Sequence, residues 1–197
     1  MSRLLLPAAA LLTLAATAAE AHTGIGAAAG LAHGFAHPLG GIDHVLAMVT
    51  VGVFAAQLGR RALWLVPLSF IAVMIAGAAI AMAGIGLPLV EIGIGLSVVV
   101  LGLCVAGGYR MPVLAAMAVA GVFAPFHGHE HGAAMPEALS GLEYAAGFVL
   151  ATALLHVAGI AIGRAAGKLG DAFAARAMCA TGSLIALAGI AILIPLL

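Results

Sequence analysis

Residues 63–84 read LWLVPLSFIAVMIAGAAIAMAG and contain no charged side chain. A helix of about 20 apolar residues is long enough to cross the hydrocarbon core of a bilayer. The same character extends along the chain, because 65% of its 197 residues are apolar and only seven are basic and seven acidic. The charged fraction is 7%, far below the roughly 25% of a soluble domain. The sequence therefore predicts an all-α integral membrane protein.

Five other apolar stretches have a similar length, and short segments with glycine, arginine or histidine separate them. Each is close to the length that a helix needs to span a bilayer, and the fourth is the shortest. We therefore expect six transmembrane helices in a single membrane domain that covers residues 22–197. The six expected helices cover residues 42–58, 63–84, 88–108, 111–126, 142–163 and 177–197.

Composition also excludes several classes of protein. The net charge is zero and the few basic residues are scattered, so the chain offers no basic patch to nucleic acid. No GxxxxGK[ST] phosphate-binding loop is present, so any transport through this chain depends on a gradient or a separate partner rather than on its own ATPase domain. The two cysteines lie inside apolar stretches and indicate no disulfide framework.

The N-terminal segment is typical of a cleavable signal peptide. Arg3 provides a basic start, residues 4–19 form a short apolar run, and AEA at residues 19–21 matches the small-x-small cleavage site. We expect cleavage of residues 1–21, so that the mature chain begins at His22. The alternative is an uncleaved first transmembrane helix, which the shortness of the apolar run disfavours.

Basic residues mark the cytoplasmic side of a bacterial membrane protein. If the mature N-terminus is periplasmic, every Lys and Arg of the mature chain falls on the cytoplasmic side. We therefore expect a multi-pass protein of the bacterial inner membrane with both mature termini in the periplasm. The residues that set this orientation are Arg60, Arg61, Arg110, Arg164, Lys168 and Arg176.

This orientation collects most acids and histidines at the periplasmic mouth. Only Asp171 among the mature acids falls on the cytoplasmic side, and only His156 lies deep within an expected helix. A chain with so few polar groups has concentrated its carboxylates and imidazoles at one mouth, which indicates metal binding there. The groups expected at this mouth are His22, His33, His37, Asp43, His44, Glu91, His127, His129, Glu130, His131, Glu137 and Glu143.

The segment HPLGGIDH, residues 37–44, is the most specific motif. Pro38 suits the first position of a helix and disfavours helix at the residue before it, so we expect His37 at or before the start of the first mature helix. Asp43 and His44 then fall in its second turn. A carboxylate inside a membrane segment costs roughly 2.5–3.5 kcal/mol on insertion scales. A divalent cation shared with the two imidazoles would offset that cost, whereas the alternative is a polar Asp43–His44 pair that bridges two helices.

The segment FHGHEHG, residues 126–132, supplies a second cluster in the expected periplasmic loop after the fourth helix. His127, His129 and His131 can reach one ion from either an extended or a turning loop. If the signal peptide is removed, the amine and imidazole of His22 add a chelating pair. Imidazole suits Zn²⁺, Cu²⁺, Fe²⁺ and Ni²⁺, and mixed nitrogen and oxygen ligands suit Ni²⁺ or Cu²⁺. The absence of a nearby cysteine argues against Cu(I) and against a cysteine-based zinc site.

HPLGGIDH, FHGHEHG and a cleavable signal followed by histidine together resemble the HupE/UreJ family, which are small nickel/cobalt permeases associated with hydrogenase and urease maturation. The resemblance covers essentially the whole chain. It implies a six-helix transporter domain that imports Ni²⁺ or Co²⁺ as cargo, with no permanent cofactor and no enzymatic activity. The positions that it places in the metal pathway are His37, Asp43, His44, Glu91, His127 and His131.

Two positions depart from the family pattern FHGxAHGxE. Ala134 stands where the pattern has glutamate, and Glu130 stands where it has alanine. Glu130 and Glu137 are the two candidates to supply the missing carboxylate. The ligand set and the choice between nickel and cobalt therefore stay open.

The residues alone leave several alternatives. A membrane sensor or accessory subunit would bind the metal without transporting it. A membrane haem protein would use His44 and His156, and an intramembrane hydrolase would use Ser183 with His156, although no nucleophile-elbow motif surrounds that serine. His156 itself is either a core histidine bonded to a carbonyl or a lower metal ligand, and Glu91 is either a pathway residue or an interfacial one. A homo-oligomer also remains open.

Overall fold

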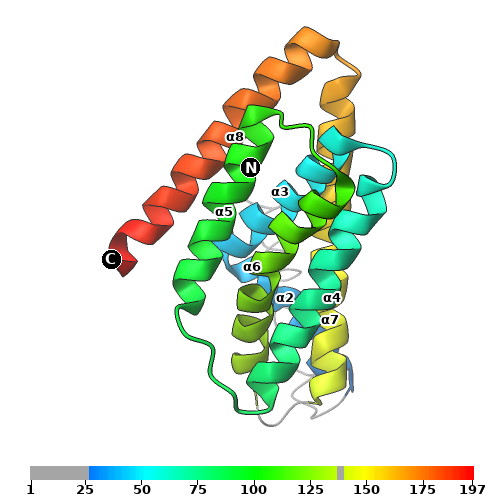
Figure 1. Ribbon diagram of the computed structural model, residues 1–197. Coiled ribbons are helices and arrows are strands. Elements are labelled where there is room, and N and C mark those ends of the chain that lie inside the picture. Colours follow the sequence, from blue (N-terminus) through cyan, green and yellow to red (C-terminus); the bar gives the residue numbers. More distant parts are fainter. Residues whose placement is uncertain (1–26, 137–139) are drawn as a thin grey trace, which may run out of the picture.

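The computed structural model describes residues 27–136 and 140–197 (Figure 1). The expected signal peptide at residues 1–21, His22 and Glu137 lie outside the described residues. No strand occurs in the described ranges, so the all-α prediction is confirmed for them. The helices are α2 (Ala27–Gly40), α3 (Ile42–Leu58), α4 (Ala62–Met82), α5 (Val90–Gly107), α6 (Val113–Ala133), α7 (Gly141–Gly167) and α8 (Asp171–Leu193), followed by the short 3-10 helix η1 (Ile194–Leu196).

Local sequence explains where several of these helices begin and end. Gly59 follows α3 with φ of 66°, and Gly108 follows α5 with φ of 57°. Positive φ costs glycine little, so the chain can turn sharply there. Pro112 precedes α6 in an extended conformation, because a proline fits next to the first helical turn.

Four helices are long and apolar enough to cross a membrane, namely α4, α5, α7 and α8 with its η1 extension. A fifth span results if α2 and α3, which are bent by 86° with respect to each other, count as one broken span. The helix α6 is 21 residues long but is not among these candidates, and its last two turns carry three histidines and a glutamate. The structure thus indicates a multi-pass membrane protein, but the expected number of six spans is not confirmed.

The helices form one elongated bundle (Figure 1) in which α3 packs against α7, α4 against α6, and α5 against α8. Glycines make these contacts close. A Cβ on Gly52 would collide with the backbone of α7, and one on Gly128 would collide with the backbone of α4. On α5, Gly102 lies against the backbone of α8 in the same way. Small residues at helix contacts are the usual means of association in a membrane, where burial of apolar surface gives little driving force.

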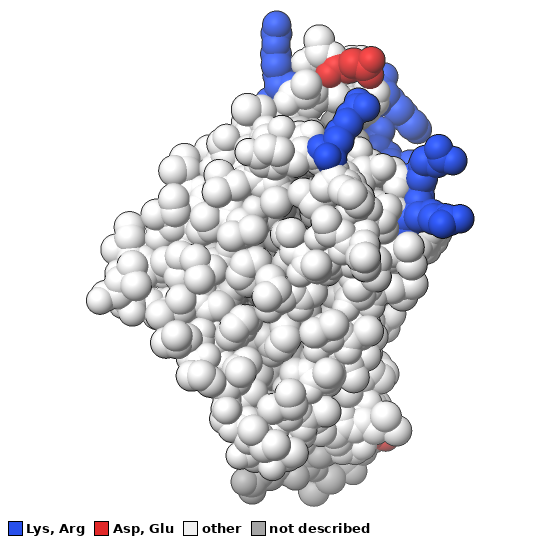
Figure 2. Space-filling view, viewed as in Figure 1, with Lys and Arg blue, Asp and Glu red and all other residues white. Residues whose placement is uncertain are grey.

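The two ends of the bundle differ in charge. The Lys and Arg side chains gather at one end (Figure 2), where the α3–α4, α5–α6 and α7–α8 connections lie (Figure 1). Exposed aromatic side chains lie in or near these connections, with Trp64 70%, Tyr109 60% and Phe173 55% exposed. Aromatic and basic side chains at one level are typical of a membrane–water interface.

Two expectations from the sequence are corrected. Residues 27–40 form the separate helix α2, so His37 lies in the last turn of that helix and Pro38 lies inside it rather than at the start of the next. Residues 127–131 are the last turns of α6 rather than part of a loop. The expected fourth helix at residues 111–126 was therefore too short, because the polar histidines hid its continuation.

Candidate metal-binding site

A cavity of about 270 Å³ opens at the end of the bundle opposite the basic residues. Four helices contribute to its lining: α2, α3, α5 and α6. Five of the site residues predicted from the sequence meet here. The lining consists of His37, Gly40, Gly41, Asp43, His44, Glu91 and Glu130.

Gly41 lies next to this cavity and interrupts the helix between α2 and α3. Its extended backbone (φ −101°, ψ 119°) ends one helix and begins the other at an angle of 86°. A Cβ at this position would lie 2.6 Å from Asp43 Oδ1 and 3.1 Å from His44 Nδ1. Only glycine fits this place without moving those side chains. The break thereby brings His37 and His44, from two different helices, to the same cavity.

Asp43 orients the ring of His44. Nδ1 of His44 lies 3.0 Å from Asp43 Oδ1, and the backbone N–H of His44 donates to the same oxygen at 2.7 Å. The carboxylate can only accept, so Nδ1 carries the ring proton and Nε2 keeps its lone pair. Nε2 is buried and forms no hydrogen bond with any described residue. A carboxylate that fixes the tautomer in this way is the usual partner of a metal-binding histidine.

Ser97 has the same effect on His127. Its hydroxyl donates to Ile94 O at 2.6 Å and lies 2.8 Å from His127 Nε2. Because the hydroxyl has only one proton, His127 Nε2–H must donate to the serine oxygen. The lone pair is then on Nδ1 of His127, a buried atom for which no described group serves as a partner.

His131 lies one helical turn beyond His127 on the same face of α6. Its ring stacks on Phe148 with centres 5.1 Å apart and planes at 21°. Neither of its ring nitrogens forms a hydrogen bond within the described part of the chain. The ring centre of His131 lies 4.7 Å from the ring centre of His44 and 5.2 Å from that of His37. The ring centres of His44 and His127 are 4.9 Å apart.

These spacings decide how the histidines relate to a metal ion. Within residues 27–136 and 140–197, no three His, Cys, Asp or Glu side chains are yet close enough to hold an ion as they are placed. Two imidazoles that bind one ion at a right angle, each with a metal–nitrogen distance of about 2.1 Å, have ring centres about 4 to 5 Å apart. The observed rings are already at about that separation, so ring rotations rather than backbone movement would bring the lone pairs to one point.

The remaining predicted residues lie around this cluster. Glu91, in the first turn of α5, is exposed, and Glu130 is half-buried, and both line the cavity. His129 points elsewhere: its Nε2 accepts from Leu87 N at 3.0 Å and lies 3.0 Å from Ile85 O. This histidine therefore links α6 to the α4–α5 connection by a hydrogen bond, close to the first turn of α5, which contains Glu91.

Two buried groups at this end were not found from the sequence. Ser97 is the only hydroxyl-bearing side chain in residues 88–108, and this isolation within an apolar helix was the signal available. Tyr144 is buried with its ring centre 6.2 Å from that of His37, and its hydroxyl is without a partner among the described residues. An aromatic residue near the expected start of a membrane helix gave no comparable signal, because tyrosine is common at the interface.

The unpartnered atoms form a consistent group. Seven buried side-chain polar atoms of the described residues have no hydrogen-bond partner, and six of them are imidazole nitrogens of His44, His127, His131 and His156. The buried hydroxyls of Thr50, Ser97 and Thr152, in contrast, all have one. A buried polar group without a partner costs about 1–3 kcal/mol. The fold tolerates that cost at histidines, which suggests that a ligand removes it.

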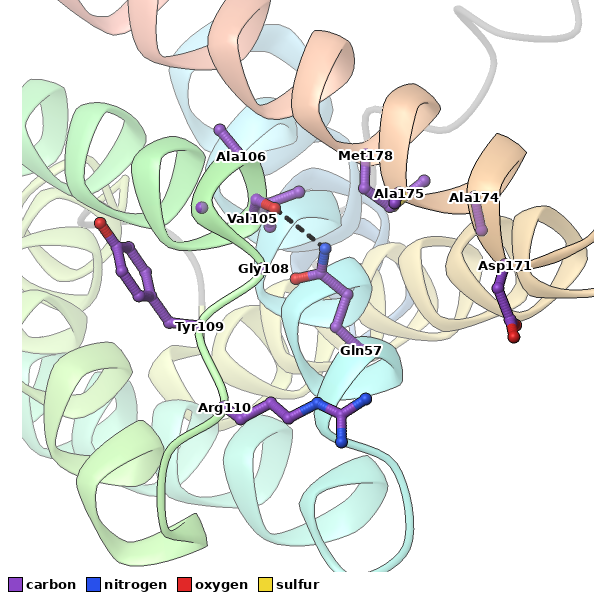
Figure 3. A pocket seen from close by; sticks show the side chains of 11 residues that line it. Gln57, Val105, Ala106, Gly108, Tyr109, Arg110, Asp171, Ala174, Ala175 and Met178 are labelled. Carbon is purple, nitrogen blue, oxygen red and sulfur yellow. Dashed lines mark hydrogen bonds between the residues drawn. The ribbon is translucent and has the colours of Figure 1, made fainter.

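A second cavity, of about 550 Å³, lies at the basic end (Figure 3). Its polar lining includes Gln57, Arg110 and Asp171, but no histidine. The amide nitrogen of Gln57 already donates to Val105 O at 2.9 Å (Figure 3). This cavity is the larger of the two, but the imidazoles are at the other end.

Known proteins match this chain over most of its length. The model of the HupE / UreJ protein family matches residues 10–192. The chain is 45% identical over 186 residues to "Protein HupE" of Rhizobium leguminosarum bv. viciae, which covers 92% of this chain and 95% of the relative. No solved structure matches the chain.

Proposed function

The chain belongs to the HupE/UreJ family, which is associated with nickel and cobalt uptake for hydrogenase and urease, and we propose on this basis that it is a secondary permease for Ni²⁺, Co²⁺ or both. It carries the ion from the periplasm to the cytoplasm across the bacterial inner membrane, for the maturation of such metalloenzymes. The ion is the cargo rather than a resident cofactor.

The observation that carries this proposal is the cluster of buried, unpartnered imidazoles beside the cavity of about 270 Å³. Neutral imidazole nitrogen and carboxylate oxygen are donors that suit Ni²⁺ and Co²⁺. The described residues carry no cysteine at this end, since Cys104 and Cys179 both lie elsewhere, on α5 and α8. The donor set at this end is thus made of nitrogen and oxygen, a combination that suits Ni²⁺.

The hydrated ion first meets the carboxylates. Glu91, Glu130 and Asp43 all line the cavity, and Asp43 lies in the first turn of α3. Their negative charge offsets the cost of bringing a divalent cation into a membrane segment. We propose that His22, at the start of the mature chain, joins in this capture.

The ion then exchanges water for imidazole nitrogen. His44 and His127 each hold one ring nitrogen unprotonated, since Asp43 and Ser97 occupy the other. Because these partners fix the tautomers before the ion arrives, binding requires rotation of the rings but no change of tautomer. His131 of α6 adjoins His44, and His37 of α2 adjoins His131, so these two imidazoles are the further donors.

The orientation follows from the two ends. Basic residues are retained on the cytoplasmic side, so the end with the Lys and Arg side chains (Figure 2) faces the cytoplasm. The histidine end then faces the periplasm, where the ion is captured.

Uptake of labelled nickel and cobalt tests this proposal in cells that express the wild type, Asp43→Ala or Asp171→Asn. We expect metal uptake by the wild type, a decrease of at least tenfold in Asp43→Ala, and uptake within twofold of wild type in Asp171→Asn. Asp171 is a matched control because it is an exposed carboxylate at the opposite end. Membrane insertion is verified for each by immunoblot of the membrane fraction. Metal binding to purified wild type without uptake would instead indicate a sensor or an accessory subunit.

A further inference from the structure

His156 is the one unpartnered imidazole that lies far from the cavity. It is 1% exposed, near the middle of α7, and neither ring nitrogen forms a hydrogen bond with a described residue. Tyr144, at the periplasmic end of the same helix, precedes it by a distance of about 18 Å along the helix axis. A buried histidine ordinarily finds a partner such as a carbonyl, and this one does not.

The neighbours of His156 supply other donor atoms. Thr152 is one turn earlier on the same face of α7, and its hydroxyl donates to Met74 Sδ at 3.7 Å. Phe70 is one turn from Met74 on α4, and its ring meets that of His156 edge to face, with centres 5.4 Å apart and planes at 87°. These four side chains, Phe70, Met74, Thr152 and His156, form a cluster across the α4–α7 contact, which we call the inner cluster.

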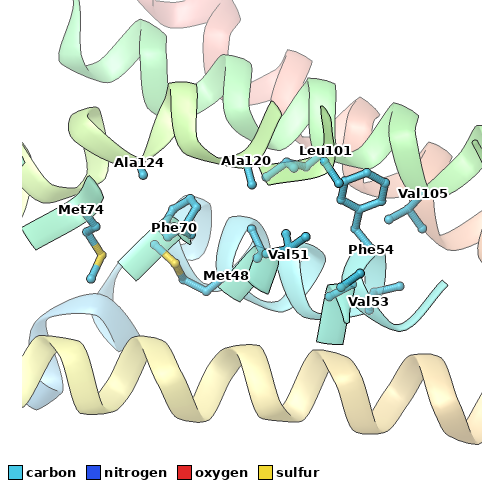
Figure 4. Packing of buried hydrophobic residues seen from close by; sticks show 14 of the residues in the cluster. Met48, Val51, Val53, Phe54, Phe70, Met74, Leu101, Val105, Ala120 and Ala124 are labelled. Carbon is cyan, nitrogen blue, oxygen red and sulfur yellow. The ribbon is translucent and has the colours of Figure 1, made fainter. Parts of the chain in front are cut away.

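Phe70 connects the inner cluster to the cavity. Its ring centre lies 5.6 Å from that of His127 and 5.4 Å from that of His156. A single aromatic ring therefore separates a metal-ligand candidate of the outer site from the buried His156. Figure 4 shows Phe70 and Met74 among the apolar side chains of α3, α5 and α6 that fill the core.

The core poses a barrier to a divalent ion. The side chains near Phe70 in Figure 4, such as Met48 and Ala124, are fully buried and apolar. An ion that leaves the carboxylates of Asp43, Glu91 and Glu130 loses the negative charge that compensates its own. It then enters an apolar medium, where the free energy of an ion is much higher than in water. Donor atoms along the way lower that cost, and the imidazole of His156 is the only unpartnered polar side chain in this part of the described core.

We propose that His156 is a second, transient binding site on the metal pathway. The Ni²⁺ or Co²⁺ ion leaves His127, passes the ring of Phe70, and is held transiently by a nitrogen of His156, with the Thr152 oxygen and the Met74 sulfur as neighbouring donors. The absence of a carboxylate in the inner cluster keeps this site weak, as an ion in transit requires. This inference rests on the proposed permease function and concerns the route, not the capture of the ion.

Two measurements on the purified full-length protein separate capture from passage. Ni²⁺ binding is measured by equilibrium dialysis in detergent, and Ni²⁺ influx is measured in proteoliposomes that contain a metal-sensitive dye. The variants are His156→Leu, which removes both nitrogens, and His156→Gln, which keeps an amide. Thr50→Val is the matched control, since it removes a buried polar group on α3 whose hydroxyl already bonds to Leu46 O.

We expect His156→Leu to bind Ni²⁺ within about twofold of the wild-type affinity while its influx falls at least tenfold. His156→Gln should show an intermediate influx, and Thr50→Val should match the wild type in both. Influx above half the wild-type rate in His156→Leu would overturn the proposal. So would an equal loss of binding and influx in both variants, or the failure of both to assemble, since His156 would then serve packing. No Ni²⁺ influx through the wild type would overturn the proposed permease function. Influx through the wild type that is unchanged in His156→Leu would overturn only the proposed role of His156.

Discussion

The two ends of the bundle contain cavities of opposite character. The basic-end cavity has about 550 Å³ and the histidine-end cavity about 270 Å³. In the larger one, Gln57 is bonded to a backbone carbonyl, whereas His44, in the smaller one, keeps a free ring nitrogen. Cavity volume alone therefore does not indicate which end would bind a metal ion. Unpartnered donor atoms favour the histidine end as the proposed metal site, because such atoms are costly unless a ligand binds.

The difference arises from how each end turns the chain. At the basic end, Gly59 and Gly108 end helices with positive φ and lead into exposed connections. At the histidine end, Gly41 is half-buried and separates two helices at 86°, so that α2 packs along α7 and contributes His37 to the cavity. This break directs the side chain of His44 into the fold, where it is 6% exposed, whereas the exposed connections at the basic end leave Arg60, Arg61 and Arg110 in water.

The largest effect on Ni²⁺ uptake is expected from two of the three histidines near the end of α6. Removing His127 or His131 by substitution with alanine should lower Ni²⁺ uptake at least tenfold, because each provides an unpartnered buried nitrogen next to His44. The matched control is His129→Ala on the same helix, which loses only its bond to the α4–α5 connection and should lower uptake less than threefold. Initial rates of labelled uptake, normalised to membrane-inserted protein, measure this. A larger loss in His129→Ala than in His127→Ala would contradict our assignment of the ligands.

A smaller effect is expected from the group that orients His127. In Ser97→Ala, no hydroxyl fixes which ring nitrogen of His127 carries the proton. The apparent affinity for Ni²⁺ should therefore weaken about threefold to tenfold, while the maximal rate of uptake changes less. Gln57→Leu removes a comparable hydrogen bond at the basic end and should change the affinity less than twofold. Saturation curves for uptake give both parameters. Equal affinities in Ser97→Ala and the wild type would show that the serine does not position the ligand.

The fold class followed from the sequence because apolar length alone determines whether a helix can span a membrane. The stretch at residues 63–84 predicted α4 (Ala62–Met82) within a few residues. The helix α2 was missed because residues 27–40 are small, and Pro38 suggested a helix start rather than a helix interior. Proline in the last turn removes one backbone hydrogen bond and disturbs the helix little, since only two residues of α2 follow Pro38.

The candidate site was predicted in part. His37, Asp43 and His44 of the HPLGGIDH motif line one cavity, and their role as metal ligands stays a prediction. The second motif was placed in a loop, so the sequence gave no reason to separate His129 from its neighbours, whereas the helical period does. The roles of Ser97 and His156 depend on contacts between helices that are distant in the sequence, and such contacts have no signature in a single chain.

In the proposed function, the buried imidazoles at the histidine end bind the transported ion. The nickel X-ray absorption spectrum of the purified full-length protein, loaded with less than one Ni²⁺ per chain, tests it most directly. We predict the scattering pattern of two or three imidazole rings with additional oxygen ligands, and its loss when His44, His127 and His131 are all replaced by alanine. A spectrum identical to that of Ni²⁺ in buffer, or an imidazole pattern that survives the triple substitution, would contradict the claim.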